Sequence, residues 1–154
     1  MVSWAEIESD VPEFAARVRQ RFDTGENKTL ATLRRDGSPR ISGTEAEFRD
    51  GELMLGMMPG SVKLADVRRD PRIALHCPTV EEPLRDDPSA WGGDAKVSGT
   101  VIAVDGEPGS EGGEGVSFAI DITEVVLTSV GATADNLVIE SWHEGVGWRR
   151  RTRV

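Results

Sequence analysis

The sequence predicts a mainly β protein in which antiparallel strands form a closed or nearly closed barrel. Within residues 29–57, three strand-like segments are separated by two Asp-Gly pairs, Asp36-Gly37 and Asp50-Gly51, which favour hairpin turns. Later segments bring the total to seven or eight strands, and only two segments have a helical pattern. A chain of 154 residues with 38% hydrophobic content is sufficient for one core, so we expect one domain over residues 1–154.

The first element is expected to be an amphipathic helix over residues 11–22. Its apolar residues recur at helical spacing: Val11, Phe14, Ala15, Val18 and Phe22. Asp10 is predicted to be the N-cap, Pro12 is compatible with the first turn, and Gly25 ends the helix.

The strands come next. Residues 29–33, 39–48 and 52–57 are predicted to form an antiparallel meander through the two Asp-Gly turns. A short helix is expected over residues 61–69, with Ser61 as N-cap and Arg68 and Arg69 at its C-terminal end. Further strands are expected over residues 72–77, 94–104, 116–130, 136–143 and 146–153, with a bulge at Gly99. Surface loops are expected at residues 78–93 and 105–115, the second acidic and flexible.

Composition narrows the classes of function. A net charge of -9 disfavours sequence-independent binding to nucleic acid, and no apolar run approaches the length of about 18 residues that a membrane span needs. The single cysteine, Cys77, gives no internal disulfide, and the first ten residues do not resemble a signal peptide, so we expect a cytoplasmic protein. The basic residues cluster at Arg34-Arg35, at Arg68-Arg69 with Arg72, and at Arg149-Arg150-Arg151 with Arg153.

The best candidate for chemistry is Gly60 followed by the helix start Ser61-Val62-Lys63. A helix N-terminus after glycine presents unpaired backbone N–H groups, which the Ser61 hydroxyl and the Lys63 ammonium would supplement around a phosphate. By local chemistry alone, an ordinary N-cap beside a surface lysine is the favoured interpretation. The segment lacks the spacing of a Walker A loop.

Metal binding and nucleophilic catalysis have little support. His76 and Cys77 are adjacent in a strand, so their side chains point to opposite faces and cannot share an ion, and His143 stands alone. There is no Gly-x-Ser-x-Gly motif, so no catalytic residue is assigned. The lack of such residues fits a reaction carried by a bound cofactor better than one carried by a protein nucleophile, because the protein then supplies only binding and orientation.

Two stretches, residues 30–44 and 51–75, resemble the pyridoxamine 5′-phosphate oxidase-like family, and more closely its actinobacterial flavin- and deazaflavin-dependent oxidoreductase branch. The resemblance rests on the order of a hairpin, a strand, the Ser-x-Lys helix start, Arg69-Asp70-Pro71-Arg72 and a further strand, and it covers roughly residues 10–104. It implies a split β-barrel of the FMN-binding-protein type, with six to eight antiparallel strands, an N-terminal helix and a short helix after the third strand. It also implies a homodimer with cofactor sites at the subunit interface.

The resemblance assigns cofactor-binding roles to seven residues: Arg40, Ser42, Gly43, Thr44, Gly60, Ser61 and Lys63. The family's Ser-Arg-Lys helix start matches Ser61-Val62-Lys63, with valine in place of arginine. Backbone groups near residues 42–44 would face the cofactor ring, and Glu45 stands where pyridoxamine phosphate oxidase has lysine. The Arg-x-His substrate motif of the true oxidases also has no counterpart, so oxidation of vitamin B6 is not expected.

The implied function is an oxidoreductase that binds FMN or the deazaflavin coenzyme F-420 and transfers hydride to a small organic substrate. An oligoglutamate tail on the deazaflavin would suit a basic channel, which Arg34 and Arg35 or the cluster at residues 149–153 would provide. Two alternatives stay open. One is a non-catalytic protein that binds flavin, haem or tetrapyrrole as a store, carrier or sensor, and the other is a structural dimer with an empty pocket.

Overall fold

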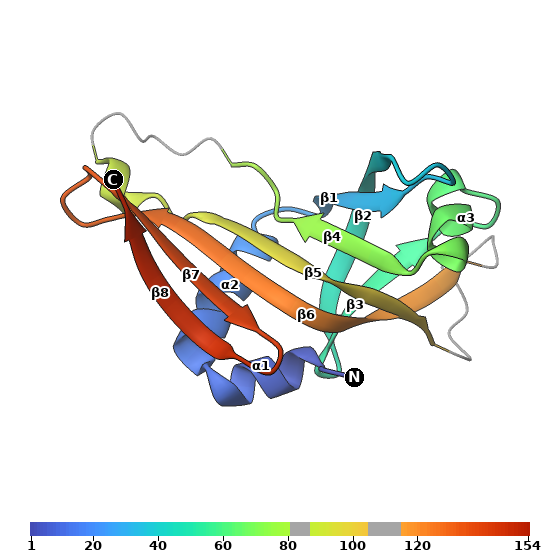
Figure 1. Cartoon of the computed structure of the whole chain (residues 1–154), viewed down its shortest axis with the longest axis horizontal. Helices are drawn as coiled ribbons and strands as arrows, with labels where there is room; N and C mark the ends of the chain where they lie inside the picture. Colours follow the sequence, from blue (N-terminus) through green and yellow to red (C-terminus); the bar gives the residue numbers. More distant parts are fainter. Residues whose placement is uncertain (81–86, 105–114) are drawn as a thin grey trace.

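The computed structural model describes residues 1–80, 87–104 and 115–154. These residues form eight strands in one sheet and three α-helices (Figure 1). The helices are α1 (Trp4–Asp10), α2 (Pro12–Phe22) and α3 (Val62–Arg69). The strands are β1 (Asn27–Leu33), β2 (Pro39–Arg49), β3 (Glu52–Met57), β4 (Arg72–His76), β5 (Asp94–Ala103), β6 (Val116–Val130), β7 (Leu137–His143) and β8 (Gly147–Arg153). The predicted mainly β class is confirmed.

The first six strands close into an antiparallel barrel. The sheet order is β3-β2-β1-β4-β5-β6-β7-β8, and an additional pairing between β3 and β6 joins the ends of the six-stranded part. β6 is long enough, at 15 residues, to pair with β3 through its first residues and with β7 through its last. β7 and β8 therefore extend the sheet beyond the barrel (Figure 1).

Both Asp-Gly pairs turn as predicted. Gly37 has φ +83°, and Asp50 and Gly51 have φ +52° and +81°, so both central residues of the second turn lie in the left-handed region that two-residue hairpins require. The sheet is irregular at Gly99 as predicted, but the extra residue lies in β6 and not in β5. Ser98 pairs with Glu124 and Gly99 with Ile122, which leaves Thr123 without a counterpart in the register. A Cβ atom on Gly99 would lie 2.1 Å from the Asp121 carbonyl oxygen, which accounts for glycine at this position.

The N-terminal region differs from the prediction, because it holds two helices. α1 was not expected, and the assignment of Asp10 as N-cap is wrong, because Asp10 ends α1 and Val11 caps α2 without a side-chain hydrogen bond. The Asp10 carboxylate instead accepts a hydrogen bond from Trp142 Nε1 in β7 at 2.9 Å. The α1–α2 unit lies along the part of the sheet that β7 and β8 extend (Figure 1).

The loop predictions are tested only in part. Within the loop predicted at residues 78–93, Pro88–Ala90 form a short 3-10 helix, while residues 81–86 lie outside the described residues. The acidic loop expected at residues 105–115 lies outside them as well, apart from Gly115. No helix in the described part of the chain is long and apolar enough to cross a membrane.

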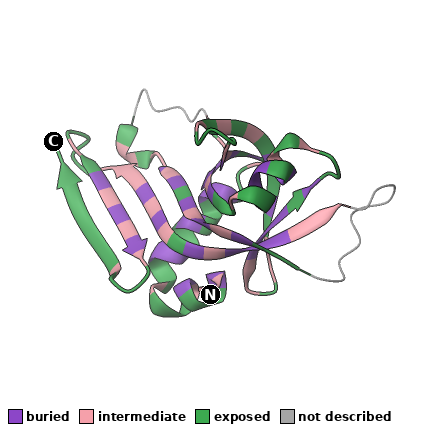
Figure 2. Ribbon diagram, turned by 45° about the vertical axis from the view of Figure 1, so that its right-hand side comes forward, coloured by how far each residue is buried: buried purple, intermediate pink, exposed green. Residues whose placement is uncertain are grey.

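Side chains alternate between the barrel interior and an outer face. In β1, Lys28, Leu30 and Thr32 are buried, whereas Thr29 and Ala31 lie on the opposite side. Figure 2 shows such alternating bands of burial along the strands that lead to the C-terminal edge of the sheet. The interior continues into a single hydrophobic core that includes Phe14, Val18 and Phe22 of α2. α3 joins this core through Leu64 and Val67 and is positioned beside β1 and β2.

Candidate functional site

The helix start has the geometry that its sequence predicts. Gly60 has φ +73° and brings the chain into α3, and the Ser61 hydroxyl accepts a hydrogen bond from the backbone N–H of Leu64 at 3.3 Å. Ser61 is therefore the N-cap. The N–H groups of Val62 and Lys63 belong to the first turn, where helix geometry provides no intrahelical carbonyl acceptor. Together with Lys63 they form a small electropositive site at the positive end of the helix dipole.

Lys63 connects this helix start to β2. Its Nζ donates a hydrogen bond to the Gly43 carbonyl oxygen at 2.8 Å. The contact reaches the part of β2 that precedes the pairing with β3, because that register begins at Ala46. Two segments that were assigned to one site, residues 40–44 and 60–63, thus lie side by side.

The side chains of β2 divide the predicted residues between two faces. Gly43 is exposed on the outer face, while Arg40, Ser42 and Thr44 alternate to the other side. Thr44 is buried, and its Oγ1 donates to the Glu45 carbonyl oxygen at 3.3 Å. The cofactor roles of Arg40, Ser42, Gly43 and Thr44 stay predictions. Among these four residues, only Gly43 lies on the outer face.

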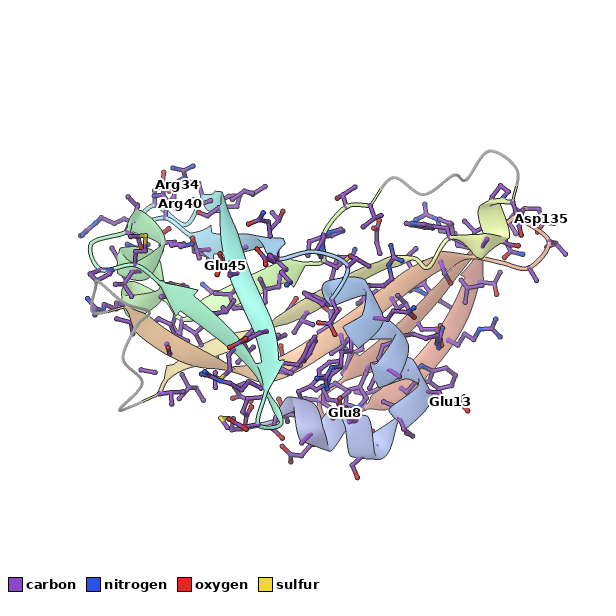
Figure 3. All side chains as sticks on the ribbon, turned by 180° about the vertical axis from the view of Figure 1, so that it is seen from behind. Glu8, Glu13, Arg34, Arg40, Glu45 and Asp135 are labelled. Carbon is purple, nitrogen blue, oxygen red and sulfur yellow. The ribbon has the colours of Figure 1, made fainter. Side chains whose placement is uncertain are left out.

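Arg40 is held by a buried carboxylate, and this contact was not anticipated from the sequence. Arg40 Nε donates to Asp66 Oδ2 in α3 at 2.7 Å, and Thr32 Oγ1 in β1 donates to the same oxygen at 2.8 Å. Arg69 Nη2 donates to the other oxygen, Oδ1, at 3.2 Å. Figure 3 shows Arg40 beside Arg34 at the end of β2 next to α3, with Glu45 further along the strand.

The Asp66 carboxylate stays ionised although it is only 2% exposed. Burial raises its pKa, but the hydrogen bonds from Arg40, Thr32 and Arg69 outweigh burial and lower the pKa to about 2. Asp66 therefore carries a full negative charge at neutral pH and links α3 to β1 and β2.

The outer face near Gly43 is lined mainly by small side chains. The cross-strand register places Gly43 opposite Thr29, and Thr29 opposite His76. The neighbouring row runs from Ile41 through three small residues, which are Ala31, Ala74 and Ser98. A Cβ atom added at Gly43 would meet nothing within 4 Å. The backbone at Gly43 is therefore open to the close approach of a planar group, with the exposed Ile41 side chain at the edge of this surface.

The remaining chemistry-bearing side chains do not converge. His76 lies half-buried on the outer face with Nδ1 2.7 Å from the Cys77 carbonyl oxygen, whereas Cys77 is buried and burial raises the pKa of its thiol. His143 Nε2 lies 3.8 Å from Glu124 Oε1. Across the described ranges, no group of three potential metal ligands occurs.

An open depression on the α1–α2 surface, lined in part by Glu8, Arg19 and Asp23, lies far from this site. Figure 3 shows Glu8 and Glu13 on these helices, well away from Arg40 and α3. The depression brings together no arrangement of catalytic groups, so it is not the candidate site.

Comparison with known proteins identifies the fold. No protein-family model matches the sequence, and no curated protein sequence matches it. Among solved structures, a pyridoxamine 5′-phosphate oxidase-related, FMN-binding protein from Nostoc punctiforme is similar with a TM-score of 0.62 at 9% identity, over 94% of this chain and 96% of that one. An F420 reductase is similar with a TM-score of 0.54 at 18% identity, over 70% and 94%. A haem-binding protein from Mycobacterium smegmatis is similar with a TM-score of 0.51 at 13% identity, over 89% and 86%. The chain therefore has the split β-barrel fold of pyridoxamine 5′-phosphate oxidase-like, FMN-binding proteins.

Proposed function

We propose that this protein is an oxidoreductase that binds FMN or a deazaflavin coenzyme such as F-420 and transfers hydride to a small organic substrate. The observation that carries the proposal is the contact between Lys63 Nζ and the Gly43 carbonyl oxygen. It joins an electropositive helix start to a flat surface of small residues, as a cofactor with a phosphate at one end and a planar ring at the other requires. The fold similarity to an FMN-binding protein and an F420 reductase supports the same class.

The phosphate would be held at the helix start. The N–H groups of Val62 and Lys63, the Ser61 hydroxyl and the Lys63 ammonium suit a phosphate group in charge and donor type. Val62 contributes no cation, in contrast to the arginine of the family that the sequence resembles. The site therefore has less positive charge than the family pattern, and it fits one phosphate group.

The ring would lie on the outer face at Gly43. Gly43 and the small side chains of Ala31 and Ala74 leave the backbone accessible, so a flat ring fits there without displacing a side chain. A bound flavin or deazaflavin supplies the hydride chemistry. The chain's own contribution is to bind, orient and cover the ring, and we propose that a second copy of the chain completes the site as a homodimer.

The proposal is tested by substituting Gly43 with valine. A Cβ atom added at Gly43 meets nothing within 4 Å and valine suits a strand, so Gly43→Val is expected to fold normally and to weaken FMN or F-420 binding by about tenfold or more. Gly56→Val in β3 is the matched control, since a Cβ atom at Gly56 also meets nothing within 4 Å. Cofactor fluorescence titration gives the affinities. Equal affinities for both variants and the wild type would contradict a ring site at Gly43.

Removing the cation at the helix start tests the other half of the site. Lys63→Ala is expected to weaken whichever cofactor binds, because the phosphate loses its ammonium partner. Arg19→Ala in α2 serves as control for the loss of an exposed positive charge, because α2 lies away from α3 (Figure 3). An unchanged affinity for Lys63→Ala would place the phosphate elsewhere.

The second candidate function is non-catalytic haem or tetrapyrrole binding. It is favoured by His76, which lies half-buried on the same outer face. The contact of its Nδ1 with the Cys77 carbonyl oxygen favours the tautomer with the proton on Nδ1, so Nε2 is left to bind a metal. The fold similarity to a haem-binding protein supports it too. A Soret band that shifts in His76→Ala, together with no binding of flavin or deazaflavin, would select this function. If the protein binds none of these ligands, the remaining hypothesis is a structural dimer with an empty pocket.

A further inference from the structure

We propose that Asp66 is a positioning residue for the cofactor phosphate, holding Arg40 and the helix start in a fixed relation to each other. The inference rests on the proposed function. Its basis is a carboxylate that is 2% exposed and accepts hydrogen bonds from three elements: Thr32 of β1, Arg40 of β2 and Arg69 of α3.

The first step concerns the spacing along α3. Lys63, Asp66 and Arg69 are three residues apart, so they lie along one side of the helix. Each of them contacts the adjacent strands. Lys63 donates to the Gly43 carbonyl of β2, Asp66 accepts from Arg40 of β2 and Thr32 of β1, and Arg69 donates to the Leu33 carbonyl of β1. Asp66 is the central and buried member of this row, and it fixes the rotation of a helix only eight residues long.

The second step concerns Arg40. A guanidinium group has five N–H donors, and the bond to Asp66 uses the one on Nε. Within the described residues, the N–H groups on its two Nη nitrogens thus remain for another acceptor. The Arg40 side chain is 23% exposed, so part of it is open to solvent. Asp66 therefore orients a second cation one helical turn from Lys63. In this proposal, that cation offsets the missing arginine at position 62.

The third step distinguishes a positioning role of Asp66 from simple repulsion of the phosphate by its negative charge. If Asp66 acts only as a nearby negative charge, its removal should strengthen the binding of an anion. If it positions Arg40 and Lys63, its removal should weaken phosphate binding even though the local charge becomes more positive. The sign of the change in affinity therefore discriminates between the two roles.

The experiment compares the binding of FMN with that of riboflavin, which has the same ring and no phosphate. Asp66→Asn is expected to weaken FMN binding by about tenfold and to change riboflavin binding by no more than about twofold. Asp70→Asn is the matched control, because Asp70 is an Asp of the same region whose partner is the exposed Arg72. It should leave both affinities near those of the wild type. If the wild type binds F-420 and not FMN, F-420 and its deazariboflavin chromophore, which lacks the phosphate, replace this pair of ligands.

A double-mutant cycle tests whether Asp66 acts through Arg40. In an Arg40→Ala background, Asp66→Asn should weaken FMN binding less than it does in the wild type, because the part of its effect that acts through Arg40 is already lost. If Asp66→Asn fails to fold, as judged by circular dichroism, Thr32→Val replaces it, because it removes one hydrogen bond to Asp66 and keeps the carboxylate. Thr32→Val should also lower FMN affinity selectively.

Three results would overturn the inference alone: an unchanged or increased FMN affinity in the Asp66 or Thr32 variant, an equal loss for both ligands, or additive effects in the cycle. A wild type that binds the phosphorylated and unphosphorylated ligands equally would overturn the proposed phosphate site, and the inference with it.

Discussion

At the scale of single residues, Arg17 and Glu140 form the principal ion pair between α2 and β7. Arg17 Nη1 and Nη2 donate to the two Glu140 carboxylate oxygens at 2.5 and 2.6 Å, and the Glu140 side chain is only 5% exposed. Arg17→Ala would leave a buried carboxylate without its partner. We expect it to lower the free energy of unfolding by about 3 kcal/mol, measured by chemical denaturation at neutral pH.

A second arginine on the same helix provides the control. Arg19 pairs with Glu8 and Asp23 at 3.1 and 3.7 Å, and all three side chains are more than a third exposed. Arg19→Ala should therefore cost about 1 kcal/mol or less. If Arg17→Ala costs no more than Arg19→Ala, the buried pair does not anchor α2. Replacing both Arg17 and Glu140 by alanine should cost less than the sum of the two single changes.

Residue type and spacing predicted some parts of the candidate site and missed others. Ser61 and Lys63 follow from local rules for a helix start, and Ser61 is the N-cap as expected. Asp66 gave no such signal, because a charged residue within a short helix usually faces solvent. Its partners Arg40 and Thr32 lie 26 and 34 residues earlier in the chain, so their meeting depends on how α3 is positioned beside the barrel.

At the scale of elements, the start of α3 allows helix capping to be separated from phosphate binding. Aspartate caps helices about as well as serine, so Ser61→Asp should change the free energy of unfolding by no more than about 0.5 kcal/mol. Its negative charge should nevertheless repel a phosphate and weaken FMN binding by about tenfold, with little effect on riboflavin. Thermal unfolding and fluorescence titration measure the two quantities.

The control for Ser61→Asp is Ser61→Ala, which removes the cap and adds no charge. It should cost about 1 kcal/mol of stability and reduce FMN affinity less than Ser61→Asp does. If Ser61→Asp binds FMN as tightly as the wild type, α3 has an ordinary cap and the phosphate lies elsewhere.

Turn chemistry made the hairpins predictable, while α1 was missed. The Asp-Gly pairs require positive φ angles that glycine accepts, so β1, β2 and β3 lie within two residues of their predicted bounds. A signal for α1 was nevertheless present. Ser3 and Glu6 form a capping box, with the Ser3 hydroxyl accepting from the Glu6 N–H and the Glu6 carboxylate accepting from the Ser3 N–H. Asp10 was predicted to be the N-cap of the second helix, whereas it is the last residue of α1, because α1 ends and α2 begins on either side of Val11.

At the scale of the whole molecule, local patterns predicted that the barrel closes but not which two strands pair to close it. The number of strands implied a barrel, whereas the closing pair, β3 with β6, joins segments such as Met54 and Ala119 that are distant in sequence. The extension by β7 and β8 also depends on long-range pairing. β8 is exposed along nearly its whole length and carries Arg149, Arg150, Arg151 and Arg153, which protect an open sheet edge against edge-to-edge association (Figure 2).

The proposed homodimer gives the last prediction. Ile41 on the outer face of β2, and Met58 and Val62 near the helix start, are 74%, 76% and 57% exposed, and such apolar side chains beside a candidate site are typical of an interface. We expect a solution mass of about twice the 16.7 kDa of one chain by light scattering after size-exclusion chromatography.

Ile41→Glu should shift this mass toward that of the monomer and weaken cofactor binding together with it, because it places a charge where apolar surface is to be buried. Val146→Glu is the matched control, since Val146 is an exposed apolar residue, 53% accessible, in the turn between β7 and β8. A monomeric wild type that still binds the cofactor would place the whole site within one chain. A dimer that persists in Ile41→Glu would place the interface on another face, and retained cofactor binding in that dimer would separate the site from the interface.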